Sequence, residues 1–173
     1  WNYQEIFHEI FYKNDKANNT SSRSHTMAPL PVVALVIEFG TYRGGATMYF
    51  QSILAQMLTV SRSESTDTQH VGISDYRILS IDIADVKMYA HEESVLRYAL
   101  RHPETSKTEF FQASSTSELS KTRIVEVMHE LRYGSKHNSL VNDDTKAAIN
   151  DLRVFVILDS DHSYDHVYAE LEL

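Results

Sequence analysis

Apolar residues along the chain follow two patterns that alternate with each other. Short continuous runs are typical of strands buried on both faces of a parallel sheet. Between them, apolar residues recur at i, i+3 and i+4, which indicates amphipathic helices. The predicted strands are 32–37, 77–81, 109–111 and 153–158, and the predicted helices are 1–12, 46–58, 86–101, 117–131 and 164–171.

This order of helices and strands predicts an α/β fold. Strands that alternate with helices form right-handed βαβ units, and such units build an open parallel sheet. Ligands of these sheets bind beyond the carboxyl ends of the strands. The residues that follow each predicted strand are therefore the candidates for chemistry.

Three polar stretches separate the patterned segments. Residues 13–30, 60–76 and 133–150 are rich in Ser, Thr, Asn and Asp and are interpreted as insertions within a single domain that spans residues 1–173. The chain begins without Met and stops at Leu173 inside a predicted helix. We therefore expect a fragment whose sheet is incomplete at its C-terminal side.

The charge and the composition narrow the function classes. The chain has 16 Lys and Arg against 24 Asp and Glu, a formal net charge of −8, which disfavours broad nucleic-acid binding. It contains no Cys, so disulfides and thiolate chemistry are excluded. No apolar run is long enough to span a bilayer, and no secretory signal is visible, so a cytoplasmic protein is expected.

The first predicted strand leads into a carboxylate and a glycine turn. Gly40, Gly44 and Gly45 allow a backbone to approach a ligand closely, and the next helix begins with free N–H groups. Glu38 suits a ligand that carries a positive charge, as S-adenosylmethionine does at its sulfonium and ammonium groups. A turn of this kind is also compatible with a tight connection that binds nothing.

Polar residues follow the second and third predicted strands. Asp82 could accept hydrogen bonds from both ribose hydroxyls of an adenosine, or it could cap the next helix. Ser114 and Ser115 could hydrogen-bond an adenine edge, or they could simply begin a helix that is capped by Ser117. The residues themselves leave both pairs of alternatives open.

Two carboxylates and an imidazole follow the fourth predicted strand. Asp159 and Asp161 offer oxygen ligands of the kind that Mg²⁺ prefers, and His162 could take a proton near neutral pH. The alternative is a helix cap with a solvated histidine. The other histidines, His166 among them, show no ligand spacing and are expected at the surface.

Three blocks of sequence resemble one known family. Residues 37–46, 78–83 and 156–163, which ends in Leu-Asp-Ser-Asp-His-Ser, are similar to the cephalosporin hydroxylase / rhamnosyl O-methyltransferase family. Residues 3–6 and 166–173 resemble the flanking helices of that family. The resemblance covers most of the chain outside the three polar stretches.

The resemblance implies a Rossmann-like methyltransferase, a three-layer sandwich around a parallel sheet. It implies an S-adenosylmethionine-dependent O-methyltransferase that acts on a hydroxyl of a sugar, a glycolipid or another small molecule, with Mg²⁺ as an additional cofactor in metal-dependent relatives. Carried over residue by residue, the cofactor-binding positions are Glu38, Gly40, Thr41, Tyr42, Gly44, Gly45, Asp82, Ser114 and Ser115, the catalytic positions are Asp161 and His162, and the metal ligand is Asp159.

The chain also departs from the family pattern. Ala113 stands where Gly is commoner, and relatives supply further metal ligands after a next strand that is absent here. One alternative is therefore a non-catalytic or incomplete fragment. Another is a nicotinamide-dependent oxidoreductase, although the glycine spacing fits that fingerprint poorly. The expected partner is a small-molecule or glycolipid acceptor, which leaves peripheral membrane association and a homo-oligomer open.

Overall fold

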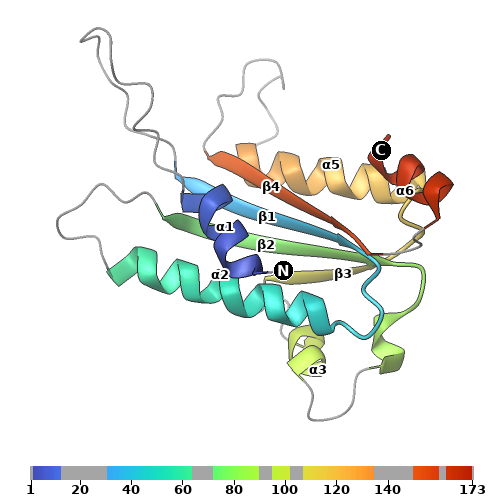
Figure 1. The fold of residues 1–173 in the computed structure, drawn as a ribbon, viewed down its shortest axis with the longest axis horizontal. Helices are drawn as coiled ribbons and strands as arrows, with labels where there is room; N and C mark the ends of the chain where they lie inside the picture. Colours follow the sequence, from blue (N-terminus) through green and yellow to red (C-terminus); the bar gives the residue numbers. More distant parts are fainter. Residues whose placement is uncertain are drawn as a thin grey trace, which may run out of the picture.

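Four parallel strands form one sheet, and its order is β3-β2-β1-β4 (Figure 1). The chain starts the sheet at β1, adds β2 and β3 on one side, and then crosses to add β4 on the other side. The strands are β1 (Val32–Phe39), β2 (Ile73–Asp82), β3 (Thr108–Gln112) and β4 (Asp151–Leu158). This computed structural model describes residues 2–12, 31–63, 72–89, 95–101, 107–134, 150–159 and 163–172.

Helices cover both faces of the sheet. Figure 1 shows α1 and α2 on one face and α5 on the opposite face, so the fold is the predicted α/β Rossmann-like sandwich of three layers. The helices are α1 (Tyr3–Tyr12), α2 (Gly45–Ser63), α3 (Val95–Arg101), α5 (Glu118–Tyr133) and α6 (Tyr164–Leu171), with a 3-10 turn, η1, at Val86–Tyr89.

The pleat of β1 divides the core into two halves. All eight residues of β1 are buried, and successive side chains point to opposite faces. Ala34 and Val36 pack with α1 and α2, whereas Leu35 and Ile37 pack with α5. A strand that is apolar at every position suits this central place in a parallel sheet, because both of its faces are covered.

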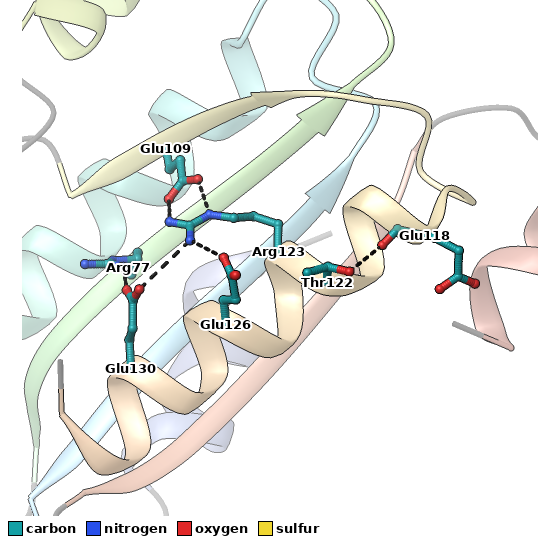
Figure 2. Close-up of polar contacts among 7 residues, drawn as sticks. All are labelled: Arg77, Glu109, Glu118, Thr122, Arg123, Glu126 and Glu130. Atoms are coloured by element: carbon teal, nitrogen blue, oxygen red, sulfur yellow. Dashed lines mark hydrogen bonds and ion pairs between the residues drawn. The ribbon is translucent and has the colours of Figure 1, made fainter. Parts of the chain in front are cut away.

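An ion-pair network joins α5 to the sheet (Figure 2). The Arg123 guanidinium donates two hydrogen bonds to the carboxylate of Glu109 on β3, at 2.6 and 2.7 Å. It also contacts Glu126 on its own helix at 3.0 Å. Arg77 on β2 donates to Glu130 at 3.1 Å. These contacts fix the position of α5 across β2 and β3.

Some predicted boundaries were wrong. The insertion expected at 60–76 is shorter, because α2 continues to Ser63 and β2 begins at Ile73. Ile73 and Tyr76 are buried, so this first part of β2 adds to the core despite its polar neighbours. The helix expected over 86–101 is described in two pieces, η1 and α3.

Other expectations lie partly outside the described residues. Residues 13–30 and most of 133–150 belong to that group. The predicted cap is confirmed: the Ser117 side chain accepts a hydrogen bond from the Ser120 N–H at the start of α5. None of the described helices is both long and apolar enough to cross a membrane.

Candidate functional site

A pocket of about 490 Å³ lies where the carboxyl ends of the strands meet. Ligand sites in proteins typically have volumes of about 300–1,000 Å³. The loops that follow all four strands contribute to its wall. It is lined by Gly40, Tyr42, Ile81, Asp82, Ile83, Ser114, Ser115, Asp159 and His166.

Backbone hydrogen bonds extend the sheet by one residue into these loops. The Gly40 N–H donates to the Ile81 carbonyl, the Ala113 N–H to the Asp82 carbonyl, and the Asp159 N–H to the Phe39 carbonyl, each at 2.9 Å. The first residue of the loop after β1, β3 and β4 is therefore fixed by the neighbouring strand. This explains why residues far apart in the sequence share one pocket wall.

The turn after β1 uses backbone conformations that favour glycine. Gly40 has φ +91° and Gly44 has φ +72°, in the left-handed region where side chains are strained. A Cβ on Gly44 would also lie 2.9 Å from a methyl carbon of Leu96 on α3. Tyr42, which does carry a side chain, has φ +47°. This turn is therefore held in a strained form by its surroundings.

Asp82 at the end of β2 holds this turn in place. Its Oδ2 accepts a hydrogen bond from the Tyr42 N–H at 2.7 Å, and its Oδ1 accepts one from the Ala84 N–H at 2.8 Å. A carboxylate with two engaged oxygens still has lone pairs for a second acceptor bond at each. Asp82 can therefore support the turn and also face a ligand in the pocket.

Glu38 lies beneath the same turn in a buried polar network. Its Oε2 accepts hydrogen bonds from the hydroxyls of Ser80, at 2.6 Å, and Thr47. The Thr41 and Ser80 hydroxyls are themselves 2.6 Å apart. Thr41 belongs to the turn and Thr47 to the first turns of α2, so the network ties both to β2. Glu38 is only 1% exposed and does not line the pocket.

The electrostatics of the site are acidic. Burial raises the pKa of Glu38 above its ordinary value, and the hydrogen bonds from Ser80 and Thr47 offset part of that effect. The charges of Asp159 and Asp82 raise its pKa further. Two carboxylates thus face the pocket and a third lies below it, an arrangement that favours a cationic ligand.

His166 was missed by the sequence analysis, which placed it at the surface. It lies on α6, lines the pocket, and has a side chain that is 26% exposed. Its Nε2 lies 3.0 Å from the Ser115 hydroxyl and 3.1 Å from Oε1 of Glu170. Only the i, i+4 spacing of His166 and Glu170 could have indicated a paired imidazole. Its neighbour Ser115 lies in the loop after β3, far from His166 in the sequence.

The structure brings half of the twelve predicted site residues to the pocket wall, and Glu38, Thr41, Gly44 and Gly45 do not line it. The catalytic candidates Asp161 and His162 lie outside the described residues. Asp159, the predicted metal ligand, is exposed at the pocket wall. No group of three or more Asp, Glu, His or Cys in the described part of the chain is placed to hold a metal ion. The described residues therefore do not supply a donor set that fits a bound Mg²⁺.

Comparison with known proteins gives one family. Residues 31–146, more than half of the chain, match the family described as rhamnosyl O-methyltransferase/CmcI. Over its 173 residues the chain is 28% identical to proteins named rhamnosyl O-methyltransferase from Mycobacterium bovis (strain BCG / Pasteur 1173P2) and Mycobacterium tuberculosis (strain ATCC 25618 / H37Rv). It spans 44% of the length of these relatives. No solved structure gives a significant match.

Proposed function

Because the chain belongs to the rhamnosyl O-methyltransferase/CmcI family, we propose that it binds S-adenosylmethionine and serves O-methylation of a sugar hydroxyl. The observation that carries this proposal is the pocket itself. It combines the glycine turn after β1 with the Asp82 carboxylate after β2 and polar side chains from the ends of β3 and β4. The word rhamnosyl in the names of the relatives supports a sugar as the acceptor.

The pocket has the chemistry that an adenosine needs. Ile83 provides an apolar side chain for a flat base, and Ser114 provides a hydroxyl for its polar edge. The remaining lone pairs of Asp82 can accept hydrogen bonds from the ribose hydroxyls. In this proposal Asp82 binds the cofactor and positions the turn that lies against it.

The charge of the site favours the sulfonium over a neutral ligand. When bound, S-adenosylmethionine supplies an electrophilic methyl group on a positively charged sulfur. Asp159 faces the same pocket as Asp82, and Glu38 lies beneath the turn. These carboxylates attract a cation, and the attraction strengthens where a bound ligand displaces water from them.

The contribution of the chain to methyl transfer is then mainly positional. The acceptor oxygen, the methyl carbon and the sulfur must be aligned, and water must be excluded. The strained turn permits close backbone approach, and the network of Thr41, Ser80, Glu38 and Thr47 keeps it rigid. Asp161 and His162 remain predicted catalytic residues.

Calorimetry with S-adenosylhomocysteine and with NAD⁺ tests this function. We expect S-adenosylhomocysteine to bind and NAD⁺ not to bind. Asp82→Asn should weaken S-adenosylhomocysteine by about 10- to 100-fold, because an amide cannot accept at both positions and hydrogen bonds to charged groups are strong. Asp85→Asn is the matched control, since Asp85 accepts a bond from Lys87 N–H outside this pocket.

Two results would contradict the proposal. Tight binding of NAD⁺ alone would favour the oxidoreductase alternative. No binding of S-adenosylhomocysteine by the wild-type chain would favour the fragment that folds without chemistry. An equal loss of affinity in both Asp variants would show that the effect of Asp82 is not specific to the pocket.

A further inference from the structure

Three side chains from one loop and one helix meet at the wall of the pocket. Ser115 follows β3, and His166 and Glu170 lie one turn apart on α6. Nε2 of His166 is 3.0 Å from the Ser115 hydroxyl oxygen and 3.1 Å from Glu170 Oε1. The Glu170 side chain is fully buried, whereas His166 and Ser115 both line the pocket. The imidazole is thus held at Nε2 by Ser115 and Glu170, and it forms part of the pocket wall.

The contacts of Nε2 bear on which ring nitrogen carries the proton. An ionised carboxylate only accepts hydrogen bonds, so with Glu170 ionised Nε2 of His166 is the donor. The Ser115 hydroxyl lies close to the same nitrogen, and in this tautomer its oxygen is a second acceptor for that N–H. In the neutral ring Nδ1 therefore carries the lone pair. No described residue provides a hydrogen-bond partner for Nδ1.

We propose that His166 is the general base of the methyl transfer, acting through Nδ1 on the hydroxyl of the acceptor; this inference rests on the proposed function. As the acceptor oxygen bonds to the methyl carbon, the carbon–sulfur bond breaks and its electron pair remains on sulfur. The hydroxyl proton passes to Nδ1. The products are the methyl ether, S-adenosylhomocysteine and an imidazolium.

Carboxylates lie on two sides of the site of that imidazolium. Glu170 contacts the ring at Nε2 from its own helix, and Asp159 and Asp82 line the same pocket from the ends of β4 and β2. The Glu170–His166 pair resembles the carboxylate–histidine pair of catalytic triads, in which the carboxylate orients a histidine base and stabilises its protonated form. In this role Glu170 and Ser115 are positioning residues.

The first test is the tautomer, measured without any turnover. Two-bond ¹H–¹⁵N spectra of the full chain, labelled in histidine, report which nitrogen is protonated, and the spectrum of His166→Asn assigns the signal. We expect the neutral ring to carry its proton on Nε2. Glu170→Gln should produce a mixture of tautomers, and the exposed control Glu172→Gln should not. A ring protonated at Nδ1 in the wild-type chain would overturn the proposal.

The second test is the rate, with methyl α-L-rhamnoside as the probe acceptor and release of S-adenosylhomocysteine as the signal. An asparagine can accept a hydrogen bond but cannot take a proton at neutral pH. His166→Asn should therefore lower kcat by about 10²- to 10⁴-fold and remove the rise of rate with pH, and the affinity for S-adenosylhomocysteine should fall far less than kcat. His8→Asn, on the exposed side of α1, is the matched control.

Three outcomes separate this inference from its rivals. Full turnover by His166→Asn would reduce His166 to a hydrogen-bonding role and overturn the proposal. Loss of the pH dependence in His162→Asn but not in His166→Asn would assign the base to His162 instead. Failure of the wild-type chain to bind S-adenosylhomocysteine would refute the proposed function, whereas the tautomer result tests the Glu170–His166 pair alone.

Discussion

At the scale of single residues, the site depends on polar groups that are held beneath and beside the pocket. Glu38 is buried under the glycine turn and accepts hydrogen bonds from Ser80 and Thr47. Asp82 accepts bonds from two backbone N–H groups, and His166 is paired with Glu170. Buried polar groups are stabilising only when their partners are present, so each of these positions should be sensitive to a change of one atom.

Glu38 gives a prediction with a defined sign. Burial raises the pKa of the Glu38 carboxyl in the folded chain above its ordinary value of 4.5, which applies to the unfolded chain. Between these two pKa values the folded chain therefore binds more protons than the unfolded chain. The stabilisation that comes from protonated Glu38 is complete below the pKa of the unfolded chain, and it is lost as the pH rises through this interval to the pKa of the folded chain. Glu38→Gln removes this titration. The free energy of unfolding of the variant, relative to wild type, should therefore increase across this interval and then level off.

Urea unfolding at several pH values between about pH 4 and pH 8 measures the effect. Glu172→Gln is the control, because Glu172 is exposed, and it should follow the wild-type pH dependence. A constant difference between Glu38→Gln and wild type at all pH values would show that the Glu38 carboxyl keeps the same pKa in both states.

At the scale of elements, the geometry of the pocket depends on the turn before α2 and on the position of α5 on the sheet. The turn reverses direction through Gly40 and Gly44 and lies against α3 at Leu96. On the other face, Arg123 joins α5 to β3 (Figure 2). The loop from β3 into α5 carries Ser115, so the position of α5 also sets the far wall of the pocket.

Adjacent glycines provide a matched test of the turn. Gly44→Ala should destabilise the chain by more than about 1–2 kcal/mol, the cost of a left-handed residue with a Cβ, because the new methyl group also meets Leu96. Gly45→Ala has open space around its Cβ and begins α2, so it should be neutral or stabilising by up to about 1 kcal/mol. Thermal and urea unfolding measure both, and equal destabilisation would contradict the described turn.

Arg123→Lys tests the connection of α5 to the sheet. A lysine cannot form the two parallel hydrogen bonds that Arg123 donates to Glu109, so we expect a loss of about 1 kcal/mol although the charge is unchanged. Arg132→Lys, at the exposed end of the same helix, should cost less. Urea unfolding at low and high salt measures the difference in the free energy of unfolding. Equal losses of this free energy in the two variants would show that the paired hydrogen bonds from Arg123 to Glu109 contribute nothing.

At the scale of the whole molecule, two apolar layers enclose the sheet. The layer on the α1 and α2 side contains a cluster of rings in which Phe7 contacts Phe11, Phe50 and Phe155, with centroids 5.2–5.7 Å apart. These rings come from α1, α2 and β4, so α1 closes the core although it precedes β1 by many residues. The first helix therefore belongs to the folded unit.

Phe7→Ala should destabilise the entire domain by about 3–5 kcal/mol, because Phe7 is completely buried and the cavity would lie among three elements. Leu171→Ala should change the free energy of unfolding by less than about 0.5 kcal/mol, since Leu171 is 71% exposed. Urea unfolding, followed by circular dichroism, compares them. A small loss for Phe7→Ala would mean that α1 packs on the sheet without contributing to its stability.

The sequence by itself determined the architecture and the edge of the sheet at which the pocket lies. Continuous apolar runs can only be buried between two layers, and helices of 3.6-residue periodicity supply those layers. Parallel strands place their carboxyl ends at one edge, so Asp82, Ser115 and Asp159 could be predicted to lie near the glycine turn. The four strands, their direction and the cap at Ser117 are confirmed.

Only the tertiary structure decided which of these side chains line the pocket. The pattern ended the first strand at Ile37, whereas β1 continues to Phe39, and the pleat then turns Glu38 inward toward Thr47 of α2. His166 was not recognisable because its partner Ser115 is 51 residues away and comes near it only in the folded chain. Local periodicity fixes the face on which a residue lies, but contacts between loops of different strands depend on how the whole chain packs.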